Sequence, residues 1–226
     1  MLFQTQTGPV SFSDGATINA RSGRLGDTIV SELHGRFYEQ NYRGNLYSIG
    51  SSITALSANT ITLTASTTPI LGVWNPNTST VNLVMLQCAL GVGPNAIGAT
   101  TFGGPFVWAS STGNTAISTG SAPFNRKTMA SSGSQAKAFP GGTALTGLTN
   151  NLVIFDGADL PYMAGLATGT VTAGTTDPSQ FKGFQGVQNF DGSLIVPPGG
   201  VLALLNVTST TSVSVAGRLL WEEVPV

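Results

Sequence analysis

The residues best suited to chemistry in this sequence are aromatic and basic side chains gathered in one short segment. It runs from residue 33 to residue 47 and reads LHGRFYEQNYRGNLY, with three of the four tyrosines interleaved with two arginines. Tyrosine and arginine are enriched at the centres of protein interfaces because each combines a large contact area with directional hydrogen-bond donors. The segment therefore predicts contact with a protein partner, unless its rings merely attach it to the rest of the chain. The candidate partner-contacting residues are Arg36, Phe37, Tyr38, Tyr42, Arg43 and Tyr47.

Aromatic and basic side chains together can also bind single-stranded nucleic acid. Here, however, the two arginines of the segment are offset by Glu32 and Glu39, and the whole chain has a net charge of -1. Nucleic-acid binding needs clustered lysines and arginines that neutralise phosphates. We therefore expect no nucleic-acid partner.

Catalytic and cofactor signatures are missing from the sequence. His34 is the only histidine and Cys88 the only cysteine, too few residues for a zinc site, and no serine sits in a Gly-x-Ser-x-Gly motif. Glu222 and Glu223 are adjacent on an expected strand, so they point to opposite faces and cannot flank one glycosidic bond. The glycines between residues 91 and 98 do not have the spacing of a phosphate-binding loop. We expect no enzymatic activity, no metal and no cofactor.

The elements that must position the aromatic segment are expected to be strands. Only 8% of the 226 residues are charged, 41% are hydrophobic and 29 are glycine, a composition that disfavours surface helices and favours strands and turns. Alternating or continuous apolar runs mark the expected strands. These are Thr60–Ala65, Pro69–Trp74, Val81–Leu90, Phe106–Ala109, Leu152–Phe155, Leu194–Val196, Val201–Val207 and Val213–Val224. Their number and their Gly- and Pro-rich connections predict an all-β jelly-roll β-sandwich.

The N-terminal region lacks a comparable strand pattern. We expect residues 1–50 to form an N-terminal arm or cap containing at most a short helix, over Asp27–Tyr38, and residues 51–226 to form the sandwich. The turn-forming residues 75–79 predict a hairpin between the apolar runs on either side, and Cys88 is expected to be a buried apolar residue. Residues 103–147 are expected to form an elaborated surface loop with one or two short strands.

Charge is distributed unevenly along the chain. No charged residue occurs from Gly44 to Asn125. A monomer usually relies on surface charge for solubility, so this stretch indicates a surface covered by other subunits. The alternative is that serine, threonine and asparagine solvate it sufficiently. No run reaches the length of a membrane span, and the first residues do not read as a signal peptide, so we expect no membrane partner.

Three stretches resemble a known family. They are LHGRFYEQNYRGNLYSIGSS, TPILGVWNPNTSTVNLVMLQCALGVG and VPPGGVLALLNVTSTTSVSVAGRLLWEEVPV. Together they resemble virion structural proteins of tailed bacteriophages, of the jelly-roll head decoration or cement type. The resemblance implies a non-enzymatic protein, made in the host cytoplasm, that forms homotrimers. It also implies docking on major capsid protein subunits at the capsid exterior and stabilisation of the shell.

A second function from a different class remains open on the residues alone. The chain could be a tail-associated receptor-binding adhesin whose loops between Gly103 and Gly147 recognise a glycan. An exposed Trp108 would then stack on a sugar ring, with nearby polar side chains as hydrogen-bond partners. If Trp108 belongs to the core, this role is lost.

Overall fold

The computed structural model describes residues 5–6, 20–21, 35–53, 66–94, 106–117, 120–158, 184–207 and 213–226. The chain divides into two compact units, Met1–Glu39 and Gln40–Val226. In the first unit, β1 (Thr5–Gln6) pairs in parallel with β2 (Ala20–Arg21). Helix α1 (Tyr38–Arg43) follows at the junction. Among the described residues, α1 is the only helix.

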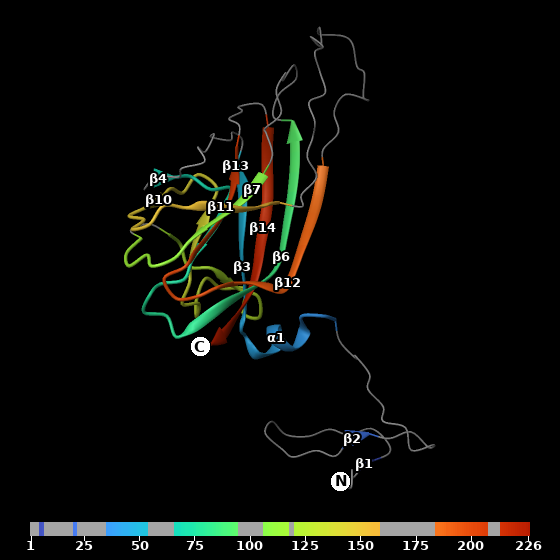
Figure 1. The fold of residues 1–226 in the computed structure, drawn as a ribbon. Helices are drawn as coiled ribbons and strands as arrows, with labels where there is room; N and C mark the ends of the chain where they lie inside the picture. Colours follow the sequence, from blue (N-terminus) through green and yellow to red (C-terminus); the bar gives the residue numbers. More distant parts are fainter. Residues whose placement is uncertain are drawn as a thin grey trace, which may run out of the picture. The chain divides into compact units, whose positions relative to one another are not determined.

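The second unit is a sandwich of two five-stranded antiparallel sheets (Figure 1). The first sheet has the order β12 (Phe184–Val196), β6 (Val81–Pro94), β14 (Val213–Pro225), β3 (Leu46–Ile53) and β8 (Phe124–Asn125). The second has the order β11 (Val153–Gly157), β7 (Phe106–Ser111), β13 (Val201–Asn206), β5 (Leu71–Trp74) and β9 (Lys137–Pro140). A separate antiparallel pair joins β4 (Ser66–Thr67) to β10 (Leu145–Thr146).

The strand pairing is that of a jelly roll. Strand β3 pairs with β14, β5 with β13, β6 with β12 and β7 with β11, so the first strand of the eight meets the last, the second meets the seventh, and so on inward. Strand β14 also pairs with β6 and so lies between β6 and β3 in one sheet. Strand β13 also pairs with β7 and so lies between β7 and β5 in the other. This nested antiparallel order is the double-sheet jelly roll. The predicted all-β jelly-roll sandwich with a short helix is confirmed.

The core lies between the two sheets. Its largest fully buried side chains include Trp108 on β7 and Trp221 on β14. A second apolar cluster covers the other face of the β13 sheet, where Leu145, Leu148 and Leu152 pack against it. All residues of β13 are therefore buried, which explains why its sequence, VLALLN, is an almost continuous apolar run. Each fully buried leucine contributes about 1.5–3 kcal/mol.

The sandwich begins earlier than the sequence indicated. We expected the arm to extend to residue 50, but β3 starts at Leu46 and pairs with β14 along its whole length. Tyr47 and Ile49 belong to the core, whereas Ser48 and Gly50 alternate with them on the opposite face of the strand. The alternation is interrupted at Ser51, which stands on the same face of the strand as Ile49 and Ile53, so the strand signal in the sequence is short. The expected helix over Asp27–Tyr38 lies mostly outside the described residues, and the helix that is present starts at Tyr38.

The expected hairpin at residues 75–79 is wrong. Strands β5 and β6 belong to different sheets, so these residues cross from one layer of the sandwich to the other. Asn75 is fully buried there, and its side-chain amide donates to the carbonyls of Val81 at 2.8 Å and Val196 at 3.1 Å. Its backbone also pairs with Gly199 and Gly200 in the crossing between β12 and β13. Asn75 thus ties the two crossings together.

Two further expectations concern single segments. The expected strand Thr60–Ala65 lies outside the described residues. The stretch 103–147 was expected to be a surface loop with one or two short strands. Its described residues instead carry the sandwich strand β7 and three short strands, β8, β9 and β10, of which β8 and β9 extend the two sheets at their edges. Strands β3, β5, β6 and β7 all come from the stretch without charge, so burial in the chain's own sandwich accounts for part of that missing charge.

Candidate functional site

The aromatic segment enters the sandwich through the end of α1. Gly44 has a φ of +81°, and its N–H donates to the carbonyl of Asn41 at 3.0 Å, while the N–H of Asn45 donates to Gln40 at 3.1 Å. These two bonds form a Schellman motif, in which glycine provides the left-handed turn that ends a helix. The turn directs the chain into β3, so the position of Tyr42 and Arg43 is fixed relative to the sheet.

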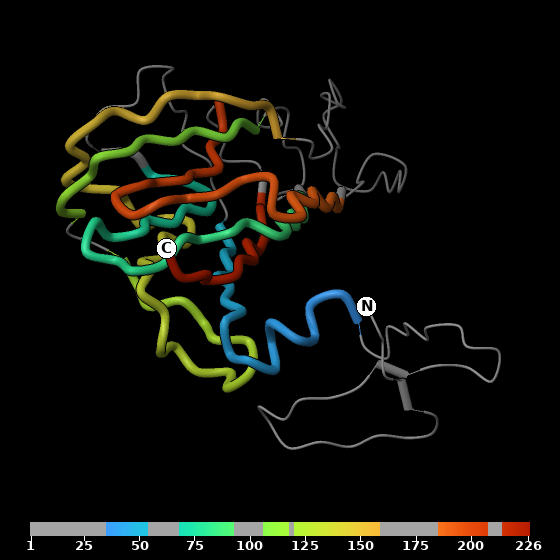
Figure 2. Tube along the Cα trace, turned by 60° about the horizontal axis from the view of Figure 1, so that its bottom comes forward, coloured from blue at the N-terminus to red at the C-terminus, as the bar shows by residue number. Residues whose placement is uncertain are grey.

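A loop from a distant part of the sequence holds this turn in place. Asn125, at the end of β8, donates its side-chain N–H to the carbonyl of Gly44 at 2.6 Å, and the N–H of Arg126 donates to the carbonyl of Leu46 at 2.9 Å. The Nζ of Lys127 lies 5.0 Å from the centre of the Tyr42 ring, a cation–π contact. Figure 2 shows the yellow-green segment around residue 125 running beside the start of β3. The loop and the end of the aromatic segment therefore form one surface.

Asn125 also organises the loop itself. Its side-chain oxygen accepts hydrogen bonds from the N–H groups of Lys127 at 2.9 Å and Thr128 at 3.2 Å, and its backbone carbonyl accepts one from Met129 at 3.0 Å. Asparagine is favoured in such turns because its side chain replaces a backbone partner. The side chain of Asn125 is buried, so the turn is supported from within.

The structure distributes the predicted partner-contacting residues over two environments. Arg36 and Tyr38 are exposed in the first unit, where the Arg36 guanidinium lies 5.3 Å from the centre of the Phe37 ring, and Phe37 is half-buried. In the second unit Tyr42 is 60% exposed and Arg43 is exposed. These positions leave the side chains of Tyr42 and Arg43 accessible to another protein.

Tyr47 differs from the other predicted contact residues. It lies on β3, its ring faces the core, and only 6% of it is exposed. Burial raises the pKa of its hydroxyl, an effect opposed by a hydrogen bond with Asn125 and reinforced by the charge of Glu223. In this fold Tyr47 packs within the chain, because strand alternation turns it inward.

The sequence interpretation missed the loop that completes the surface. Phe124 is 52% exposed and Met129 is 73% exposed, both large apolar side chains, and Arg126 and Lys127 between them are exposed as well. We call the combined surface the basic patch. It consists of Tyr42, Arg43, Phe124, Arg126, Lys127 and Met129. The signal that could have found it is the return of charge at Arg126–Lys127, directly after the uncharged stretch.

The side chain expected to stack on a sugar is buried. Trp108 has no exposed surface, its indole N–H donates to the side-chain oxygen of Gln188 at 2.8 Å, and its ring meets Phe190 edge to face at 5.3 Å between centres. The expectation of an exposed Trp108 is therefore wrong, because this position of β7 faces the interior of the sandwich. Trp108 therefore cannot stack on a sugar ring, as the glycan-binding interpretation requires.

The remaining candidates for chemistry are consistent with a structural role or lie outside the described residues. Cys88 is fully buried, as predicted, and burial raises the pKa of its thiol to about 12, with the charge of Arg218 opposing the shift. His34 lies outside the described residues. Among the described residues, no group of three or more histidine, cysteine or acidic side chains could hold a metal ion. Within the same residues, no helix has the length and apolar character needed to cross a membrane.

Comparisons with known proteins give no relative. No family model, curated protein or solved structure matches this chain.

Proposed function

We propose that this chain is a non-enzymatic structural protein of a bacteriophage virion, which self-associates and docks on the exterior of the capsid shell. The partner is the major capsid protein, and the assembled form is a homotrimer. Jelly-roll connectivity supports the class, because viral capsid proteins are among the recurrent users of this fold. Lectin domains share the fold, so the connectivity alone does not separate docking from glycan binding.

The observation that carries the proposal is the basic patch. Tyr42, Phe124 and Met129 expose large apolar surface beside three basic side chains, on a turn that Asn125 holds rigidly. Exposed aromatic and arginine side chains on a preorganised surface are typical anchors of protein interfaces, since little entropy is lost on binding. The positive charges of Arg126 and Lys127 fit an acidic region of the shell protein, whereas Arg43 interacts with the charge of Glu222.

Repetition over the shell would make modest contacts sufficient. Each copy in a homotrimer carries one basic patch, so engagement of one patch raises the effective concentration of the other two at neighbouring shell subunits. A protein whose single interfaces are weak can then remain bound to the particle.

The test uses shells assembled from the major capsid protein of the same virus. The full chain is mixed with shells that lack decoration, and bound protein is measured by co-sedimentation and by particle imaging. We expect wild-type protein to decorate the outside of the shell, and the double variant Tyr42→Ala, Lys127→Ala to bind at least about tenfold more weakly.

The control variant is Val187→Ala, which removes an exposed apolar side chain from β12, outside the basic patch. It should decorate shells like the wild type. Failure of the wild-type protein to bind shells, or equal binding by the double variant and the wild type, would contradict the proposed docking.

A further inference from the structure

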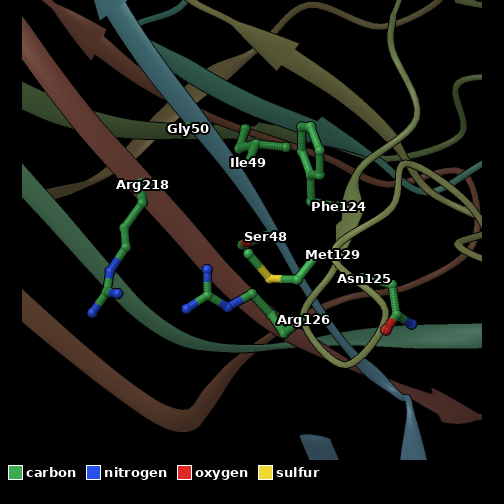
Figure 3. Close-up of a pocket in the computed structure, with 8 residues that line it drawn as sticks. All are labelled: Ser48, Ile49, Gly50, Phe124, Asn125, Arg126, Met129 and Arg218. Carbon is green, nitrogen blue, oxygen red and sulfur yellow. The ribbon is translucent and has the colours of Figure 1, made fainter.

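A pocket of about 290 Å³ shares Phe124, Arg126 and Met129 with the basic patch and lies on the side of β3 that points away from the sandwich core. Its floor includes Ser48 and Gly50 of β3, and Phe124 and Met129 of the loop line it as well. Arg126 from the loop and Arg218 from β14 complete it. Figure 3 shows the side chains of Arg126 and Met129 extending from the loop across β3, toward the side on which Arg218 lies. Segments far apart in the sequence thus build one pocket.

Two basic residues line the pocket, Arg126 and Arg218. Among the described residues that line it, none is acidic. The Arg218 guanidinium donates to the side-chain oxygen of Gln87 at 2.5 Å, and Gln87 in turn donates to Asn189 at 2.8 Å. These partners are neutral, so they orient Arg218 across the sheet without compensating its charge. Two guanidinium groups in one pocket favour an anion, above all a planar carboxylate or a phosphate.

The apolar part of the pocket is preorganised. Met129 has a φ of +59°, a left-handed conformation that a methionine rarely adopts, and the hydrogen bond of its N–H to the Asn125 carbonyl holds it there. Backbone strain of this kind persists where the surroundings determine it and recurs at binding sites. Here it accompanies two exposed large apolar side chains of the loop, Phe124 and Met129. A ligand that contacts both would remove apolar surface from water.

We propose that this pocket binds an acidic side chain of a partner polypeptide. The carboxylate lies at the guanidinium groups of Arg126 and Arg218, and an apolar side chain adjacent in the partner sequence packs on Phe124 and Met129. The volume is just below the roughly 300–1,000 Å³ of pockets for drug-sized ligands, which suits one or two side chains. A nucleic-acid strand would need a longer row of cations. The inference rests on the proposed function only for the partner's identity as a shell protein.

The test is a selection from a displayed library of random heptapeptides against the immobilised full chain. We expect enriched peptides to carry Asp or Glu beside a large apolar residue. On the variant Arg126→Gln, Arg218→Gln their recovery should fall at least about tenfold, whereas Lys137→Gln, which removes one positive charge on β9 outside the pocket, should leave recovery unchanged. The variant Arg126→Lys, Arg218→Lys keeps the charge but loses the planar donors, so its recovery should lie between the two. Thermal unfolding of each variant verifies that it is folded.

A synthetic copy of the best peptide then tests the carboxylate directly. Its binding, followed by fluorescence anisotropy, should weaken at least about tenfold when its acidic residue is replaced by the corresponding amide. Enriched peptides without an acidic residue, no enrichment at all, or equal recovery on the glutamine double variant would overturn the proposal. Arginine-dependent binding of inorganic phosphate or of a deoxythymidine decamer, with no peptide binding, would reassign the pocket to phosphate and also overturn it.

Shell binding separates this inference from the proposed function. If acidic peptides bind through the two arginines but shells are not decorated, the pocket assignment holds and the proposed function fails. If the glutamine double variant decorates shells as the wild type does and binds no fewer peptides, the pocket assignment fails while docking through Tyr42 and Lys127 stands.

Discussion

The side-chain amide of Asn125 donates a hydrogen bond to the backbone carbonyl of Gly44 at 2.6 Å. These residues are the last and the first of the stretch that carries no charge. The chain therefore loses its charged residues and regains them at the same place in the fold. As a result, Arg43 and the pair Arg126–Lys127, which are far apart in sequence, contribute to one surface.

Replacing Asn125 by alanine should destabilise the sandwich and loosen the loop. The change removes a buried hydrogen-bond donor to Gly44 and the acceptor for Lys127 and Thr128, so we expect a loss of about 1–3 kcal/mol in the free energy of unfolding. Urea denaturation followed by circular dichroism measures it. The exposed Asn151 provides the control, since Asn151→Ala should change stability by no more than about 0.5 kcal/mol. Equal losses of unfolding free energy in both variants would show that the hydrogen bonds of Asn125 do not stabilise the fold.

Replacing Gln188 by leucine should destabilise the protein, because the buried indole N–H of Trp108 donates its hydrogen bond to Gln188. The substitution leaves a buried N–H without its acceptor, and we expect it to lower the free energy of unfolding by about 1–3 kcal/mol. In a Trp108→Phe background the same substitution should cost at least about 1 kcal/mol less, because no N–H remains to be satisfied. A double-mutant cycle by urea denaturation measures the coupling, and a coupling of zero would argue against this hydrogen bond.

Alkaline pH should destabilise the protein through Cys88. Its pKa is about 12 in the folded chain and about 8.5 in an unfolded one, so above pH 8.5 the unfolded state binds fewer protons than the folded state. The stabilising contribution is present below that pH and declines toward pH 12, by up to about 1.4 kcal/mol per unit. Urea denaturation at pH 7, 9 and 10 should show the advantage of the wild type over Cys88→Ala shrinking. Tyr47 also has a raised pKa, but it titrates in both proteins. Parallel pH profiles would contradict the role of Cys88.

Self-association should depend on the edge strand β11. Val153 and Phe155 are 64% and 47% exposed on it, and within the described residues this strand pairs only with β7. An exposed apolar edge strand is a template for pairing with another copy. If the chain forms the proposed trimer, we expect Val153→Ser with Phe155→Ser to convert it to monomers in analytical ultracentrifugation. Ile195→Ser, at the edge of the other sheet, should leave the trimer intact. A wild-type monomer at micromolar concentration would refute self-association.

The sequence could predict which residues form strands but not how the strands pair. Apolar runs such as those of β5, β6 and β13 are local signals, since burial on a sheet selects them residue by residue. Pairing is decided by contacts between distant residues. Asn75 illustrates this: it reads as a turn former, yet its side chain joins two crossings between the sheets, one of them more than a hundred residues further along. No local pattern distinguishes such a crossing from a hairpin.

The candidate site was predictable to a similar degree. Tyr42 and Arg43 stand out in the sequence because aromatic and basic residues are concentrated around them. The loop of Phe124 and Met129 carries only two adjacent charges in an otherwise polar stretch, too few to stand out. By spacing alone Tyr47 belongs with Tyr38 and Tyr42, because the sequence does not reveal that a strand begins at Leu46 and turns the Tyr47 ring inward.

The place of β14 determines when the protein can acquire its structure during synthesis. This strand is the last of the eight along the sequence, yet it lies at the centre of its sheet, between β6 and β3. Until it leaves the ribosome, β3 lacks its main neighbour and the inner surfaces of both layers have no complete cover. The nascent chain must therefore keep a large apolar surface in solution until β14 has been synthesised. Only 8% of the residues are charged, so electrostatic repulsion protects the nascent chain little from aggregation. We therefore expect slow folding that depends on chaperones.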